Sequence, residues 1–126
     1  MEELLLNERK VRLAKLLSFY AKLLTENQRE IATLFTDEDY SLAELAEQFH
    51  ITRQGVYDAV SKAEKTMLQF EEKLNLISHY ETLRGILGAC ITELESIAHA
   101  NPDFRVGHAL DNLRSLIEME DSEDGI

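Results

Sequence analysis

Apolar residues recur every three or four positions along most of the chain, a period that predicts amphipathic α-helices. Such stripes occupy residues 6–24, 31–35, 42–49 and 56–77, and two more follow. Period-two alternation of strand-forming residues is absent from the sequence, and Pro102 is its only proline. The pattern therefore predicts an all-α protein.

Helix-capping residues stand where three of these stripes begin. Thr25 and Ser41 each precede a Gln or Glu by three positions, which is the spacing of a capping box. Thr52 is a third N-cap, so only His50 and Ile51 separate the third helix from the fourth. Two short helices joined this closely must cross steeply. We therefore predict a helix-turn-helix motif over residues 41–66.

The stripe of the fourth helix alternates steps of four and three without a miss. This spacing makes a heptad seam, and the predicted helix from Arg53 to about Asn75 would be roughly 35 Å long. A compact domain of this size could not cover such a helix alone, so a homodimer through the seam is one possibility. The seam consists of Val56, Val60, Ala63, Met67, Phe70, Leu74 and Ile77.

Two further seams follow, separated by Asn101-Pro102. The first contains Leu83, Leu87, Cys90, Leu94 and Ile97, and the second Val106, Leu110, Leu113 and Ile117. They predict a helical hairpin over residues 78–118 that packs on the fourth helix of the domain at residues 1–77; the first helix and a second subunit are the alternatives. The acidic residues 119–126 predict a disordered tail.

The formal net charge of -11 argues against a strong, sequence-blind nucleic-acid binder. Residues 1–65 nevertheless carry 9 basic and 12 acidic side chains, whereas residues 66–126 carry 4 and 12. An anionic ligand should therefore meet the N-terminal half. The densest cations there form a secondary basic patch, which is equally consistent with a solvated face and with an RNA-backbone contact. This patch contains Arg9, Lys10, Arg12, Lys15 and Lys22.

The chemistry of an enzyme is not indicated by any spacing in the sequence. Nucleophile and base pairs, paired carboxylates and phosphate loops are missing, so we expect no catalytic residues and no cofactor. The single cysteine and the spacing of the four histidines predict no metal site. Apolar runs are too short for membrane insertion and the first residues are acidic, so we expect a cytoplasmic protein.

From Leu24 to about Lys65 the chain resembles region 4 of bacterial sigma factors. In that architecture the second helix of the motif enters the major groove of DNA and its N-terminal residues reach the base edges. The resemblance implies a nucleic-acid-binding surface on the fourth helix. Asp58 on the same face would repel phosphate. The candidate binding residues are Arg53, Gln54, Tyr57, Ser61, Lys62 and Lys65.

Nearly the whole chain also resembles the YlxM family, helix-turn-helix proteins of Gram-positive bacteria that are encoded beside the signal recognition particle GTPases. The resemblance rests on Phe19-Tyr20 with Leu23-Leu24-Thr25, Asp39-Tyr40-Ser41-Leu42, Thr52-Arg53-Gln54 with Val56-Tyr57-Asp58, and Tyr80 after Glu71-Glu72-Lys73-Leu74. It implies a regulatory or accessory role in the particle's pathway, with the particle's RNA or GTPase subunit as partner. The alternatives are a sequence-specific DNA-binding regulator and a helical module whose acidic half binds a basic protein.

The sequence departs from related motifs in two places. His50 stands at the turn position that usually holds Gly, where a left-handed backbone would cost a non-glycine residue roughly 1 kcal/mol. We therefore expect a less tight turn. Family members also tend to have more Lys and Arg near positions 61 and 62, where this chain has Ser61 before Lys62.

Overall fold

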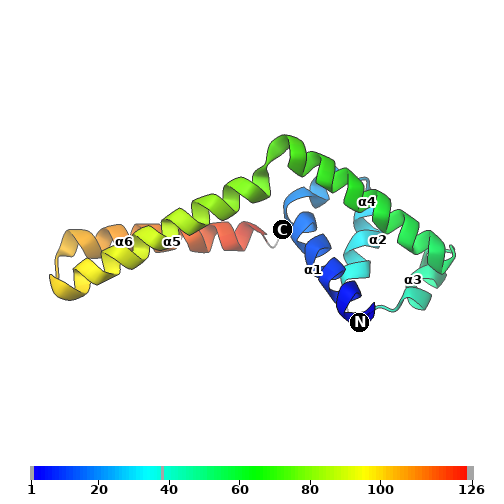
Figure 1. Cartoon of the computed structure of the whole chain (residues 1–126), viewed down its shortest axis with the longest axis horizontal. Helices are drawn as coiled ribbons and strands as arrows, with labels where there is room; N and C mark the ends of the chain where they lie inside the picture. Colours follow the sequence, from blue (N-terminus) through cyan, green and yellow to red (C-terminus); the bar gives the residue numbers. More distant parts are fainter. Residues whose placement is uncertain (1, 38, 125–126) are drawn as a thin grey trace. The chain divides into compact units, whose positions relative to one another are not determined.

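All regular elements in the described part of the chain are helices (Figure 1), which confirms the predicted all-α class. The structure, a computed structural model, describes residues 2–37 and 39–124. Along the chain the helices are α1 (Glu2–Tyr20), the 3-10 turn η1 (Ala21–Leu23), α2 (Glu26–Thr36), α3 (Leu42–Gln48), α4 (Arg53–Leu74), α5 (Leu76–Ala100) and α6 (Phe104–Asp124). Within the described residues, no helix is both long and apolar enough to cross a membrane.

The chain divides into two compact units at Asn75. This residue ends α4 in the left-handed conformation, with φ of 53°, and its N–H donates to the carbonyl of Glu71 at 2.8 Å. Asparagine tolerates this conformation better than most residues, so it is a suitable helix terminator. The boundary lies two residues before the one predicted from the seam, which runs on to Ile77. Packing of the C-terminal hairpin on α4 stays a prediction.

The core of the first unit forms where α1, α2 and α4 meet. Leu13 and Tyr20 of α1 and Ala32 of α2 have no exposed surface. The predicted heptad seam belongs to this core, because four of its residues are equally buried within the same chain. These residues are Val56, Val60, Ala63 and Met67. That part of the seam is therefore covered within one chain, and dimerisation of the protein stays a prediction.

Side-chain caps set the starts of the short helices, as the sequence predicted. The Thr25 hydroxyl accepts a hydrogen bond from the Gln28 N–H at 3.2 Å, and the Gln28 side chain accepts one from the Thr25 N–H at 3.3 Å. Ser41 and Thr52 supply the hydroxyl half of the same motif at α3 and α4. These contacts satisfy N–H groups that have no partner inside the helix.

The turn between α3 and α4 is tight, which corrects the expectation drawn from His50. This residue adopts the left-handed conformation, with φ of 56°. Its N–H donates to the carbonyl of Glu47 at 3.3 Å, and the N–H of Ile51 donates to that of Ala46 at 3.0 Å. The pair of bonds is a Schellman motif, normally built on glycine. The hydrogen bonds hold histidine in a strained backbone conformation instead of relaxing the turn.

Gly55 permits the close approach of this turn to α4. A Cβ atom at Gly55 would lie 3.3 Å from the Ile51 Cβ and 3.2 Å from the Thr52 Oγ1, both tighter than ordinary contacts. The neighbour that requires glycine here is therefore the turn itself.

The second unit is a hairpin of α5 and α6, which pack along each other (Figure 1). Asp103 begins α6 by accepting a hydrogen bond from the Arg105 N–H at 2.8 Å. Leu110 is the one residue of this unit that is buried in the described part of the chain. Cys90, a member of the first seam predicted for the hairpin, is exposed. Helix α6 continues to Asp124, where the sequence predicted a disordered tail from residue 119; Gly125 and Ile126 lie outside the described residues.

Candidate nucleic-acid interface

Three of the predicted contact residues are exposed cations on α4. Arg53 is the first residue of the helix, directly after the Thr52 cap, and Lys62 and Lys65 follow on its outer side. Val56 and Val60, on the side away from the two lysines, are fully buried, so packing holds the helix in place. The arrangement leaves long, positively charged side chains in solvent on a rigid support.

Gln54 and Asp58, one turn apart on the same face, interact with each other. The Gln54 Nε2 donates a hydrogen bond to the Asp58 Oδ1 at 3.1 Å, and both side chains are exposed. Gln54 would have to exchange this bond before its amide could pair with a base edge. The Asp58 carboxylate also places negative charge on this face, so base reading is less favourable here than the sequence suggested.

Tyr57 does not point freely outward, because its ring is partly buried in the first unit. The ring meets Phe35 edge to face, with centroids 6.1 Å apart, and Phe35 itself belongs to the core. Tyr57 also lines a shallow groove with Leu6 and Arg9 of α1. Its position on the flank of α4 that faces α1 suits packing more than contact with a base.

Arg9 connects the two surfaces that the sequence predicted as separate. Its Nη2 donates to the Ser61 hydroxyl at 2.9 Å and its Nε to the Glu64 Oε2 at 3.2 Å. The Arg9 side chain is 25% exposed and that of Glu64 18%, so the pair is shielded from solvent more than a surface ion pair. The Ser61 hydroxyl therefore already binds Arg9 of α1. Glu64, which no sequence pattern selected, neutralises the charge of Arg9.

Arg9 and Lys10 also lie over the ring of Phe35. The Arg9 Cζ is 5.9 Å from the ring centroid and the Lys10 Nζ is 5.6 Å from it, within the range of a cation–π contact. The secondary basic patch is thus divided by its environment. Arg9 and Lys10 help to attach α1 to the unit, whereas Arg12, Lys15 and Lys22 are exposed.

These contacts determine which chemistry the surface can offer. Six exposed cations belong to the first unit's candidate surfaces, and Arg or Lys side chains of this kind neutralise phosphates. Of the predicted polar contact residues, Gln54 and Ser61 are engaged and Tyr57 is partly buried, whereas Arg53 is exposed. The described residues include no group of three or more His, Cys, Asp and Glu that could hold a metal ion. The surface therefore fits the backbone of a nucleic acid better than its bases. The six cations are Arg53, Lys62, Lys65, Arg12, Lys15 and Lys22.

Comparison with known proteins identifies relatives of this chain. A family model described as "Putative helix-turn-helix protein, YlxM / p13 like" (UPF0122) matches residues 7–101, so the match ends just before α6. UPF0122 proteins of Lactococcus lactis and Geobacillus kaustophilus are 48% and 44% identical over 80 residues, which cover 64% of this chain and 72% and 73% of those proteins. A UPF0122 protein of Streptococcus suis is 34% identical over 105 residues, 83% of this chain and 93% of the relative. The chain is a member of the UPF0122 family of YlxM / p13-like proteins.

Proposed function

We propose that this chain is a non-enzymatic, nucleic-acid-binding accessory protein of the signal recognition particle pathway, and that it binds the particle's RNA through its first unit. The observation that carries the binding is the set of exposed cations on α4: Lys62 and Lys65 on the side away from the buried Val56 and Val60, and Arg53 in the first turn. The assignment to this pathway is what the resemblance to the YlxM family implies.

The state of the neighbouring side chains favours RNA over sequence-specific reading of DNA. Duplex RNA is recognised mostly through its shape and backbone, which requires cations and few base contacts. Gln54 is bonded to Asp58 and Ser61 to Arg9, so two of the predicted base-reading groups already have partners. Arg12 on α1 and Lys22 on η1 add charge that a nucleic-acid backbone could meet.

A DNA-binding regulator is the second candidate, and Arg53 is the observation that favours it. Its place in the first turn of the second motif helix is the one from which base edges are read in helix-turn-helix proteins. An Arg in that position can donate two hydrogen bonds to guanine, a contact worth about 1 to 3 kcal/mol of discrimination.

The test is a titration of labelled signal recognition particle RNA, the particle's GTPase subunit and a random-sequence DNA duplex, read by fluorescence anisotropy. We expect sub-micromolar binding of the RNA and weaker binding of the duplex. Replacing Arg53, Lys62 and Lys65 by Gln should reduce the slope of log affinity against log salt by about 2, because each phosphate contact contributes roughly 0.7 to 0.9. If the chain binds neither the particle's RNA nor its GTPase subunit, the pathway role is refuted.

The matched control for this test removes a cation from the second unit. Arg105 is highly exposed, with 87% of its side-chain surface accessible, and its only described ion-pair partner is the nearby Asp103. Arg105→Gln should leave both affinity and salt slope unchanged. Equal losses in the control and in Lys62→Gln would mean that overall charge, and not the α4 surface, determines binding. Sequence-selective binding of DNA that depends on Arg53 alone would favour the second candidate.

A further inference from the structure

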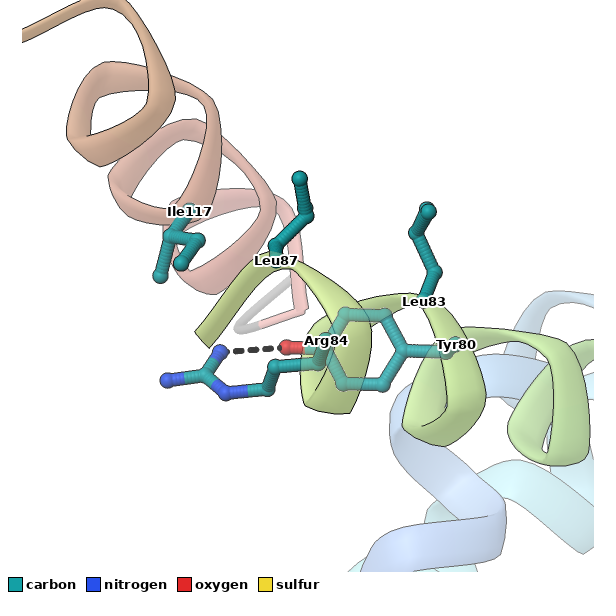
Figure 2. Close-up of a pocket in the computed structure, with 5 residues that line it drawn as sticks. All are labelled: Tyr80, Leu83, Arg84, Leu87 and Ile117. Atoms are coloured by element: carbon teal, nitrogen blue, oxygen red, sulfur yellow. Dashed lines mark hydrogen bonds between the residues drawn. The ribbon is translucent and has the colours of Figure 1, made fainter. Parts of the chain in front are cut away.

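Helix α5 carries two apolar stripes, and α6 covers only one of them. The stripe facing α6 is half-buried and includes Leu87, which lines a small pocket with Tyr80, Leu83 and Arg84 of α5 and Ile117 of α6 (Figure 2). The Arg84 Nη1 donates a hydrogen bond to the Tyr80 hydroxyl at 2.8 Å along this pocket. The second stripe borders the first at Leu83, which also lines this pocket, and each of its members is exposed. They are Leu76, His79, Leu83, Ile86, Cys90, Glu93 and Ile97, named here the outer stripe.

The outer stripe has the spacing of a helix-pairing surface. Its members alternate steps of three and four residues over the length of α5, the period that keeps one side of a helix against a partner helix. Large apolar side chains on it remain in solvent: Leu83 is 51% exposed, Ile86 58% and Ile97 51%. A two-helix hairpin in which Leu110 is the one buried residue among those described has little core of its own, so covering this stripe would stabilise it.

We propose that the outer stripe is covered by the outer stripe of a second copy of this chain, with the two α5 helices antiparallel about a two-fold axis at Ile86. The choice of a second copy rests on the polar members of the stripe. His79 and Glu93 each lie seven residues from Ile86, on opposite sides. A two-fold axis there brings His79 of each copy level with Glu93 of the other, so that a hydrogen-bond donor meets a carboxylate.

The charges of the hairpin permit this pairing although the unit is acidic. The residues along one border of the outer stripe are Thr82, Ala89 and Ser96, none of which is charged. Glu81 and Glu95 lie on the far side of α5 from the stripe, by the helical period. Self-association therefore brings no acidic residues of α5 together except Glu93, which has His79 as its partner. The proposal does not depend on nucleic-acid binding.

Sedimentation velocity on the full chain under reducing conditions tests the proposal first. We expect a species of twice the 14.4 kDa chain mass at tens of micromolar protein. Ile86→Glu should weaken the dimer at least about 100-fold, since two charges would meet on the axis. Because Ile86 is exposed within one chain, this variant should keep the helical content of the wild type by circular dichroism. The matched control is Thr92→Glu, an exposed position on the same helix away from the stripe, which should remain dimeric.

Disulfide cross-linking tests the antiparallel register. In the background Cys90→Ala, Ile86→Cys should oxidise to a covalent dimer, because the two cysteines would face each other across the axis. Cys90 of the wild type should not form such a disulfide. In this register it lies eight residues along the helix from Cys90 of the other copy, about 12 Å away, whereas a disulfide joins Cα atoms about 4.4 to 6.8 Å apart. A monomer at every concentration would overturn the proposal. A dimer that survives Ile86→Glu, or one that cross-links through Cys90, would also overturn it.

Discussion

Replacing His50 by glycine should stabilise the first unit. His50 is exposed and left-handed, with φ of 56°, so its side chain contributes little while its Cβ strains the backbone. Relief of the left-handed conformation is worth about 1 to 2 kcal/mol. The greater freedom of glycine in the unfolded chain offsets about 0.5 to 1 kcal/mol of this gain. We expect a net increase of about 0.5 to 1 kcal/mol in the free energy of unfolding.

Urea denaturation followed by circular dichroism measures this change. With a denaturant slope of about 2 kcal/mol per molar, the unfolding midpoint should rise by about 0.3 to 0.5 M. His50→Ala is the control, because alanine keeps the Cβ and should leave the midpoint nearly unchanged. Asn75→Gly should gain less than His50→Gly, since asparagine tolerates the left-handed region better. A midpoint that falls with glycine, or rises equally with alanine, would refute the strain argument.

Three further predictions concern the caps and the buried hydroxyl. Thr52→Ala removes the cap of α4 and should cost about 1 kcal/mol of unfolding free energy, whereas Thr66→Ala, inside the same helix, should cost less; equal losses would count against a capping role. Tyr20→Phe should cost about 1.5 to 3 kcal/mol in thermal or urea unfolding, because the fully buried ring loses its bond to a carboxylate of α4; no loss would show that water replaces this bond. The Arg105 side chain and N–H lower the pKa of Asp103, so the cap of α6 should weaken as pH falls through that depressed pKa, and Asp103→Asn should remove this acid dependence from the amide exchange of α6.

The sequence alone predicted the helices and their starts well, because those features depend on residues close together in the chain. Thr25, Ser41 and Thr52 cap helices through contacts three residues away, and such contacts form whenever the local helix forms. The three–four spacing of apolar residues likewise identified α4. Family membership, inferred from short strings such as Asp39-Tyr40-Ser41-Leu42, followed from the same local information.

The candidate site was predicted only in part, because several of its side chains depend on distant partners. Arg9 meets Ser61 and Glu64 across more than 50 residues, so no spacing rule could show that this cation is engaged. Tyr57 is half-buried for a similar reason, since Phe35 of α2 packs against it. Helical period alone places such residues on the outside of α4, and only the packing of α1 and α2 shows which of them solvent reaches.

The heptad seams show most clearly which features local sequence pattern determines and which depend on tertiary structure. Periodicity identifies apolar faces, yet it cannot assign a partner to a face, because many helices in one chain share the same period. The structure places the seam residues Val56, Val60, Ala63 and Met67 in the core of the first unit, and it leaves Cys90 of α5 exposed. His50 follows the same division. The sequence indicates that a left-handed backbone at His50 would cost free energy. Only the hydrogen bonds of the folded turn show that the residue adopts this conformation nevertheless.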